Sequence, residues 1–419
     1  MSVSASWFRV GGTLVVSLVV ASRAVAQVDL DLDRYVEIVL RAHPSAAQSA
    51  GLERAAEAES KASRLFPDPV FEYLRDRATQ TEPAGFRATE TGYSVLQTIP
   101  WPGTRSAGIR AVDRAAEALR AGAEGARFEL AAEARQAFAR LTAARALLEI
   151  ARGAEDDARS LRDLVTRRAE LGESRESDRI KATVEWLRQQ RNLATAEREA
   201  EAAEAIVRAL AVEPLPSPLA VRPVAHEPQP RLDREALAGR IADRSPRLRA
   251  ARAEAERRDA LLSQARRARI PDLGLTFFKQ KELDKQATGF AVGVTLPLWN
   301  ANRGEIARTD AASRIASAEA ERVRIELVTA LHGRLTQLQI AGDQVTLLDR
   351  AILPAAARSV GLVRLSFEEG ETSLLDLLDA QRTFRDTQRE AAEARLALSL
   401  ALGEVQRLAG PDFNPWSPA

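Results

Sequence analysis

The side chains that could do chemistry in this chain are carboxylates and guanidinium groups, which crowd long stretches rich in Ala and Leu. Lys and Arg total 60 and Asp and Glu total 59, so the formal net charge is only +1. On helices, spacings of three and four between such residues favour solvated ion pairs over acid–base catalysts. A near-neutral chain also lacks the basic surface that nucleic-acid binding requires, so we expect no nucleic-acid partner.

Residue types for nucleophilic or metal chemistry are scarce. The chain has no Cys, a single Met and three His, namely His43, His226 and His332. We find no His-x-x-x-His pair, no Gly-rich phosphate loop and no G-x-S-x-G elbow. The sequence therefore predicts no catalytic residues, no cofactor and no metal site, and we expect that the protein is not an enzyme. Any metal cargo would be selected by a partner.

The N-terminal segment has the pattern of a secretory signal. Arg9 precedes the apolar run from Val10 to Ala21, and Ala24-Val25-Ala26 supplies the small residues that a signal peptidase requires. We expect residues 1–26 to be a signal peptide. A retained membrane anchor is the alternative, but the run is short for a helix that must cross about 30 Å of hydrocarbon. Any membrane insertion would then use β-strands.

The elements that must position the charged residues occur twice. Landmarks recur in the same order in the two halves: Leu32-Asp33-Arg34 with Leu232-Asp233-Arg234, Phe66-Pro67-Asp68 with Ile270-Pro271-Asp272, and Leu171-Gly172-Glu173 with Glu369-Gly370-Glu371. Such ordered self-similarity indicates an internal duplication. We predict a first repeat over 27–212, a proline-rich linker over 213–230, a second repeat over 231–410 and a C-terminal tail over 411–419.

Each copy reads as a helix, a strand pair, a very long helix, a sharp turn and a return helix. The stretch from Arg105 to about Leu171 has no proline and would form a helix roughly 100 Å long. Its counterpart contains Pro354, where we expect a kink. Gly172 and Gly370 are placed to end the long helices. Helices of this length must pack as coiled coil, within the chain and with other chains.

Four strands are predicted, at about 70–77, 91–99, 273–281 and 288–296. In the second strand of each pair, large apolar residues alternate with small ones, as in a barrel strand with one face to lipid. The predicted lipid-facing residues are Tyr93, Val95, Ile99, Phe290, Val292, Val294 and Leu296. Four strands cannot close a barrel, and lipid does not tolerate open edges, so closure needs several copies of the chain. A soluble four-stranded sheet is the alternative.

With these features the chain resembles the outer-membrane efflux proteins, the TolC-like family, over nearly all of its length after residue 26. The resemblance rests on Pro67-Asp68-Pro69, on Leu96 to Pro100 and most of all on Glu369 to Arg382. It implies a mainly α fold with a small transmembrane β-barrel part. Three copies of the duplicated helix–β-hairpin–long-helix–return-helix unit would build a trimeric α-barrel in the periplasm and a shared twelve-stranded β-barrel in outer-membrane lipid.

The resemblance also implies roles for the two sharp turns, which in the family close the periplasmic mouth. They would contact a periplasmic adaptor (membrane-fusion) protein, which couples to an inner-membrane pump, of the RND type. The residues predicted for this tip and adaptor contact are Gly172, Asp178, Gly370, Thr372, Leu374 and Leu375. Asp376 and Asp379 match a pair of carboxylates that forms an acidic ring in the trimer, and they share a helix face. A solvated helix face is the alternative.

Thr372 departs from the family pattern, because many members carry an Arg there that bridges the closed tip. Arg175 is the predicted replacement bridge. Pro100-Trp101-Pro102-Gly103 and the second tip resemble the heavy-metal-efflux (CzcC-like) branch. The resemblance therefore implies a passive outer-membrane channel of a tripartite efflux system that exports drugs or heavy-metal cations. A periplasmic coiled-coil scaffold without a pore, and the duct of a type I protein secretion system, are the alternatives.

Overall fold

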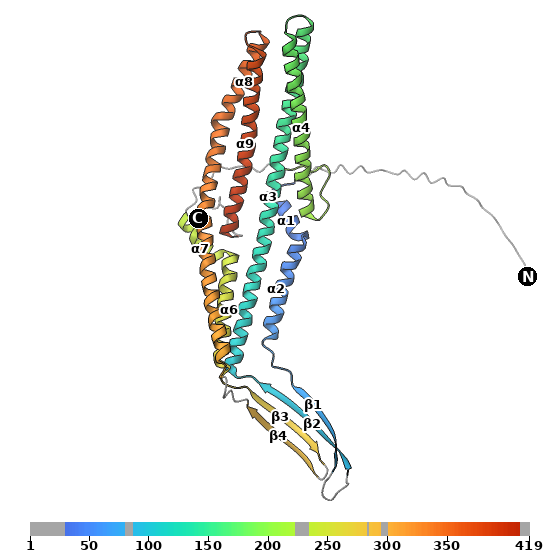
Figure 1. Cartoon of the computed structure of the whole chain (residues 1–419), viewed down its shortest axis with the longest axis vertical. Coiled ribbons are helices and arrows are strands. Elements are labelled where there is room, and N and C mark those ends of the chain that lie inside the picture. Colours follow the sequence, from blue (N-terminus) through green and yellow to red (C-terminus); the bar gives the residue numbers. More distant parts are fainter. Residues whose placement is uncertain (1–29, 80–86, 223–233, 283–284, 295–300, 411–419) are drawn as a thin grey trace, which may run out of the picture.

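The computed structural model describes residues 30–79, 87–222, 234–282, 285–294 and 301–410. The chain is elongated: two helical hairpins project at one end, a four-stranded sheet lies at the other, and shorter helices pack alongside between them (Figure 1). The predicted combination of a mostly helical fold with a small sheet is confirmed.

The first half of the chain contributes two short helices, a strand pair, a very long helix and a return helix. Their bounds are α1 Leu32–Ala42, α2 Pro44–Ala62, β1 Val70–Thr79, β2 Arg87–Ile99, α3 Pro102–Glu170 and α4 Glu176–Ala211. α3 has 69 residues, which corresponds to about 100 Å. α3 begins at Pro102, ahead of the predicted Arg105. Proline is tolerated in the first turn because the N–H groups there have no acceptor within the helix, so no hydrogen bond is lost.

The second half repeats this order. Its elements are α5 Arg234–Arg244, α6 Pro246–Arg267, β3 Leu273–Lys281, β4 Gln286–Val294, α7 Arg303–Leu347, the π-helical segment η1 Leu348–Ile352, α8 Leu353–Glu368 and α9 Leu374–Ala409. The segment η1 lies just before Pro354, where the sequence predicts a kink. Pro354 has no N–H to donate, and the wider turn, in which the Leu353 N–H bonds the Leu348 carbonyl, lets the helix continue past it.

The four strands form one antiparallel sheet in the order β1-β2-β3-β4. The two central strands, β2 and β3, come from different halves of the chain, so the sheet joins the repeats. β1 and β4 are the edges, and each has one side without a strand partner among the described residues. β2 begins at Arg87, earlier than predicted, and β4 is described only to Val294. The predicted lipid-facing Leu296 lies outside the described residues.

The helices pack mainly through small side chains. α3 buries a row of alanines, among them Ala107, Ala111, Ala121, Ala134 and Ala158. Larger apolar residues fill three clusters. In the cluster between α1, α3 and α4, the buried Tyr35 donates a hydrogen bond of 3.0 Å to the Val207 carbonyl. Burial raises the pKa of the Tyr35 phenol. The small alanine side chains let the helix backbones approach closely, so the long helices pack side by side.

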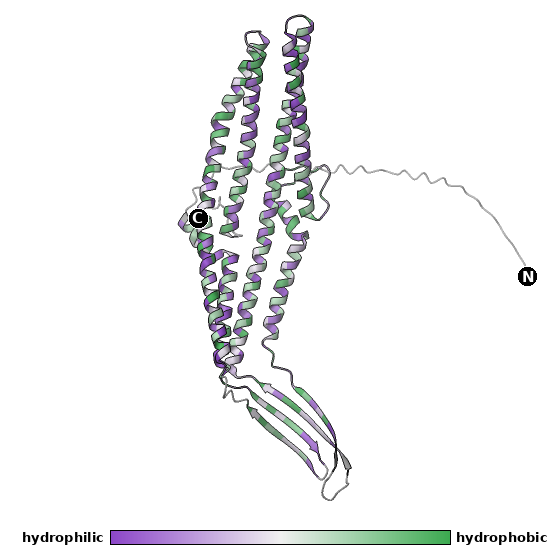
Figure 2. Ribbon diagram, in the orientation of Figure 1, coloured by the Kyte–Doolittle hydropathy of each residue, from purple (hydrophilic) through white to green (hydrophobic). Residues whose placement is uncertain are grey.

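Polar and apolar residues alternate around the long helices along their whole length (Figure 2). Within the part of the chain that the structure describes, no helix has the length and apolar character needed to cross a membrane.

Candidate functional site: the hairpin ends and the sheet face

The two hairpins end in the same turn. Gly172 and Gly370 have φ of 79° and 83°, in the left-handed region that disfavours a side chain. After each glycine the next N–H reaches back to the last helical turn: Glu173 donates to the Arg168 carbonyl at 2.8 Å, and Glu371 to the Ser366 carbonyl at 2.8 Å. These bonds satisfy terminal carbonyl groups and reverse the chain sharply.

The second hairpin end carries a capping box that the sequence argument overlooked. Asp376 accepts hydrogen bonds from the Ser373 N–H at 3.1 Å and the Ser373 hydroxyl at 2.6 Å, and the Asp376 N–H donates back to the hydroxyl. The Ser373 hydrogen bonds lower the pKa of the Asp376 carboxyl. The Ser-x-x-Asp spacing was visible in the sequence. Asp376 therefore caps α9, while Asp379 is exposed on the same helix.

Leu374, one of the predicted tip contacts, lies in the interior of the chain. Its side chain is only 7% exposed and packs in a cluster with Leu161 and Val165 of the first hairpin and with Phe367 and Leu377 of the second. It is interior to the chain because the first turn of α9 leans on α3. Leu375, by contrast, is 65% exposed, and the Thr372 hydroxyl donates to the Val363 carbonyl at 3.5 Å. Leu375 thus remains at the surface, and Leu374 does not.

The first hairpin end lacks a comparable cap. Asp178 corresponds to Asp376 in the repeat, but the N-cap residue of α4 is Arg175, whose side chain makes no cap hydrogen bond. Asp178 instead pairs with Lys181 at 3.3 Å. The exposed Arg175 side chain has no hydrogen-bond or ion-pair partner among the described residues, so within one chain it does not supply the predicted bridge.

Arg168 makes the bridge between the hairpins. Its guanidinium donates to the Phe367 carbonyl at 3.4 Å and to the Glu368 carbonyl at 3.0 Å, at the C-terminal end of α8. The same group lies 5.3 Å from the centre of the Phe367 ring. A cation at helix-terminal carbonyls is favoured by the helix dipole. No sequence pattern predicted this contact, because the partners of Arg168 lie 199 and 200 residues further along the chain. That separation is about one repeat period.

Two ion pairs extend this connection below the turns. Arg364 of α8 contacts Asp157 of α3 at 3.1 Å, and Arg385 of α9 contacts Glu185 of α4 at 2.8 Å. The Arg385–Glu185 pair is nearly buried, with side chains 13% and 16% exposed. Together with Arg168 these contacts tie the hairpins of one chain to each other.

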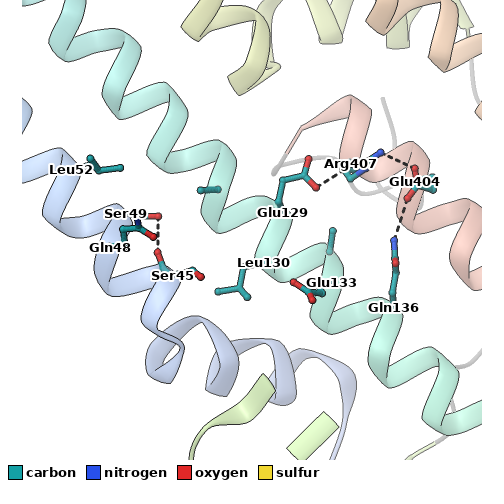
Figure 3. Close-up of a pocket in the computed structure, with 12 residues that line it drawn as sticks. Ser45, Gln48, Ser49, Leu52, Glu129, Leu130, Glu133, Gln136, Glu404 and Arg407 are labelled. Carbon is teal, nitrogen blue, oxygen red and sulfur yellow. Dashed lines mark hydrogen bonds and ion pairs between the residues drawn. The ribbon is translucent and has the colours of Figure 1, made fainter. Parts of the chain in front are cut away.

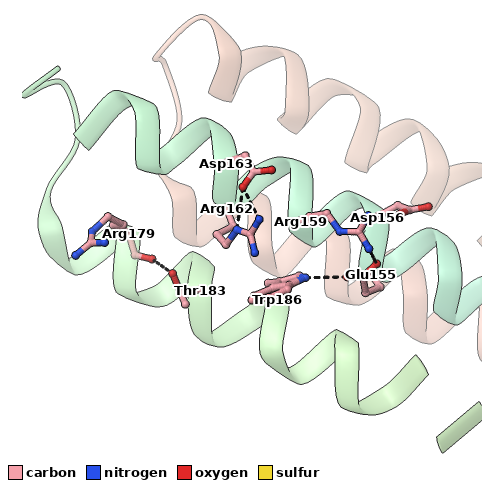
Figure 4. Close-up of polar contacts among 8 residues, drawn as sticks. All are labelled: Glu155, Asp156, Arg159, Arg162, Asp163, Arg179, Thr183 and Trp186. Carbon is pink, nitrogen blue, oxygen red and sulfur yellow. Dashed lines mark hydrogen bonds and ion pairs between the residues drawn. The ribbon is translucent and has the colours of Figure 1, made fainter. Parts of the chain in front are cut away.

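The first hairpin is held by an unusual polar clamp around Trp186. The indole N–H donates to the buried Glu155 carboxylate at 2.8 Å, and Arg159 contacts the other oxygen at 2.5 Å. The Arg162 guanidinium lies 4.0 Å from the centre of the indole ring (Figure 4). Hydrogen bonds from Trp186 and then from Arg159 lower the pKa of the Glu155 carboxyl. This arrangement sets the register of α4 on α3.

One face of the sheet carries large apolar residues on all four strands. The register pairs Val95 with Phe71 on one side and with Phe277 on the other, and Phe277 in turn with Phe290. Because directly paired residues share a face, all predicted residues in the described strands lie together there. That face, here named the outer face, includes Phe71, Tyr73, Tyr93, Val95, Ile99, Leu273, Leu275, Phe277, Phe290, Val292 and Val294.

The opposite face, here named the inner face, carries mostly small and polar residues on β3 and β4. It carries Gly274 and Thr276 of β3 and Gly289, Ala291 and Gly293 of β4. Phe278 is an exception, and its ring covers Gly289, where an added Cβ would lie 2.9 Å from the ring carbon Cζ. The sheet is therefore most clearly two-sided at β4, whereas the inner face of β1 and β2 also carries Val70, Leu74 and Leu96.

A cavity of about 610 Å³ lies beside the long helices, between α2, α3 and α9 (Figure 3). Its charged groups bind one another: Arg407 contacts Glu129 at 3.3 Å and Glu404 at 3.1 Å, and Gln136 donates to Glu404 at 3.2 Å. These contacts join the first repeat to the second. Among the described residues, no group of three His, Cys, Asp or Glu side chains is placed to hold a metal ion.

Two long helical hairpins attached to a small sheet are also the fold of solved outer-membrane channels. The outer-membrane channel OprN has this fold, with a TM-score of 0.78, 19% identity and coverage of 90% of this chain and 89% of that one. The outer-membrane channel CmeC of Campylobacter jejuni also has a TM-score of 0.78, at 15% identity, over 92% of this chain and 87% of that one.

The chain belongs to the outer membrane efflux protein family, whose model matches residues 41–211 and again 237–411. It is similar to the cobalt-zinc-cadmium resistance protein CzcC of Cupriavidus metallidurans, with 28% identity over 330 residues, 77% of this chain and 76% of CzcC. The nickel-cobalt-cadmium resistance protein NccC of Alcaligenes xylosoxydans xylosoxydans is 28% identical over 299 residues, 68% of this chain and 65% of NccC.

Proposed function

We propose that three copies of this chain form a passive duct that carries solutes out through the outer membrane. The observation that carries the proposal is the sheet: it has a largely apolar outer face, a more polar inner face and two edges without a strand partner among the described residues. Open edges are not tolerated in lipid. Four strands from each of three copies make twelve, an even number within the range of closed barrels.

Apolar stripes on the hairpins support the association of copies. On α4, Ile180, Val184 and Leu187 are 55%, 42% and 50% exposed and recur at helical spacing. On α8, Leu362 and Leu365 are 68% and 54% exposed. Each stripe is left uncovered by the chain's own helices. We propose that α4 of one copy packs beside α8 of the next, which closes the helical wall of the duct.

The hairpin ends form the periplasmic mouth in this proposal. Three copies bring three Asp376 and three Asp379 carboxylates around one opening, and a narrow ring of negative charge favours cations. The exposed Leu375, the turn glycines Gly172 and Gly370, and Asp178 would meet a periplasmic adaptor protein. That adaptor would couple the duct to an inner-membrane pump, of the RND type.

The cargo that we propose is a heavy-metal cation. Its support is the similarity to CzcC and NccC, whose names record resistance to cobalt, zinc and cadmium and to nickel, cobalt and cadmium. In this proposal the pump and adaptor select the metal, and the duct supplies an exit with an acidic entrance.

The test is planar-bilayer conductance of the purified, detergent-solubilised protein, with and without an added trivalent cation, next to its mass in detergent. Discrete channel events from a trimer, suppressed by the cation, are the expected result. A trimer without conductance would point to a tightly closed mouth, to be opened by substitution at Arg168. A monomer that neither inserts nor conducts would overturn the duct and favour a scaffold without a pore.

A further inference from the structure

The charged residues of the sheet are sorted by face. Four cations lie on the outer face, in register with its aromatic residues: Arg75, Arg77, Lys279 and Lys281. The acidic residues of the described strands, Glu72, Asp76 and Glu90, all lie on the inner face, where Asp76 is paired directly with Glu90. Opposite charges could have neutralised one another on one face, but the register keeps them apart.

The four cations are exposed and uncompensated. None of the four has a hydrogen-bond or ion-pair partner among the described residues, and the side chain of each is at the surface. Glu282, which directly follows Lys281 in the chain, is engaged with Lys285 at 3.1 Å. This differs from the helices, where Arg and Glu pair repeatedly at short range. Four like charges on one small surface favour an anionic partner.

Their position along the strands is also ordered. Going from the helices toward the strand hairpins, the outer face carries Ile99, Leu273 and Val294, then Val95, Phe277 and Phe290. Tyr73 and Tyr93 follow, with ring centroids 5.0 Å apart, in the same row as Lys279. Arg75 and Lys281 lie one row beyond.

Along the strands the outer face therefore carries an apolar band, then a row of tyrosines, and then a rim of cations formed with Arg75, Arg77, Lys279 and Lys281. From Ile99 to Tyr93 the distance along the strand is about 20 Å, comparable to the apolar band of an outer-membrane strand. Tyrosine rings prefer the boundary between hydrocarbon and headgroup, and Lys and Arg beyond that boundary lie at the depth of the lipid phosphates.

We propose that Arg75, Arg77, Lys279 and Lys281 form a binding surface for phosphate-bearing lipid headgroups at the end of the sheet farthest from the helices (Figure 1). This inference rests on the proposed duct, because it requires the outer face to contact lipid. The occupant is a phosphorylated glycolipid of that leaflet. The inner face, with its acidic residues, would leave the lumen negative at the same height.

The test compares lipid retention by two variants. The rim variant combines Arg75→Gln, Arg77→Gln, Lys279→Gln and Lys281→Gln. The matched control combines Glu72→Gln, Asp76→Asn and Glu90→Gln, on the inner face of the same sheet. Each protein is incubated in detergent with diphosphorylated lipid A and with its dephosphorylated form, and bound lipid is counted by native mass spectrometry.

We expect wild type and the control variant to retain the phosphorylated lipid at least about tenfold better than the dephosphorylated one, and the rim variant to lose that preference. Excess inorganic phosphate should displace little, since the acyl chains contribute to binding. Equal retention of both lipids by wild type, or an unchanged preference in the rim variant, would overturn the headgroup surface. Conductance of the wild type in neutral lipid separates the two proposals. A wild type that conducts but has no preference for phosphorylated lipid refutes only the headgroup surface. A wild type that neither inserts nor conducts refutes both the duct and the headgroup surface.

Discussion

The guanidinium of Arg168 donates a hydrogen bond of 3.0 Å to the main-chain carbonyl of Glu368, 200 residues further along the chain. The contact joins the last turn of α3 to the last turn of α8, and therefore the two hairpin ends that we place at the mouth. It needs no acidic partner, because the carbonyl groups at a helix C-terminus attract a cation. The chain has Thr372 where the resemblance described above implies a bridging Arg, and Arg168 links the hairpins from a different position.

Removing Arg168 should loosen the mouth. We expect Arg168→Ala to cost about 1 kcal/mol of hairpin packing, since a partly exposed charged hydrogen bond contributes little more than that. The trimer should conduct more often in planar bilayers. Arg167→Ala is the matched control, because Arg167 is the exposed neighbour in the same turn. Identical channel opening in the two variants would show that Arg168 has no role in closure.

The Ser373–Asp376 capping box should stabilise the start of α9. We expect Ser373→Ala to lower hairpin stability by about 1 kcal/mol, measured as faster amide hydrogen exchange in residues 374–380. Ser177→Ala in the first hairpin, where the N-cap is Arg175, should change exchange little. Equal effects of the two serines would mean that the capping box contributes nothing.

The same capping box should weaken in acid. The pKa of Asp376 is lowered by the Ser373 hydrogen bonds. Its contribution is therefore complete above the unfolded carboxyl pKa, about 4, and is lost as the pH falls through the lower folded value. Hydrogen exchange in α9, compared between wild type and Asp376→Ala, should show a difference at neutral pH that disappears in strong acid. A difference that persists in acid would contradict the assignment.

The acidic ring should govern block by multivalent cations. Asp376→Asn combined with Asp379→Asn removes six charges from a trimer, and we expect at least about tenfold more trivalent cation to be needed for block, because closely spaced charges act together. Asn at position 376 keeps a side-chain oxygen that can accept from Ser373, so the helix cap survives. Asp386→Asn, further along α9, is the control. Unchanged block in the double variant would dismiss the ring.

The outer face of the sheet should not tolerate charge. Phe290→Arg places a cation in the apolar band, where it should cost about 2–4 kcal/mol per chain. We expect loss of heat-resistant trimers from the outer-membrane fraction. Ala291→Arg is the control, because the adjacent side chain projects from the inner face. If Phe290→Arg assembles as well as Ala291→Arg does, the outer face does not contact lipid.

Much of the local structure was determined by the sequence alone. The proline-free stretch after Arg105, the glycines at 172 and 370 and the alternation from Gly289 to Val294 each specify backbone conformation within a few residues, so periodicity and turn chemistry suffice to predict them. The Ser373-x-x-Asp376 cap was equally local and could have been read in advance.

The tertiary structure decided which of these elements meet. Arg168 contacts Glu368, Leu374 becomes interior beside Leu161, and the register of β2 on β3 brings Phe277 beside Val95. Each of these contacts joins residues more than a hundred positions apart. No short-range pattern encodes them, because they depend on how long helices and strands settle against one another once formed. The sequence therefore determined the parts and their order, and packing determined which side chains bridge, which are buried and which share a face.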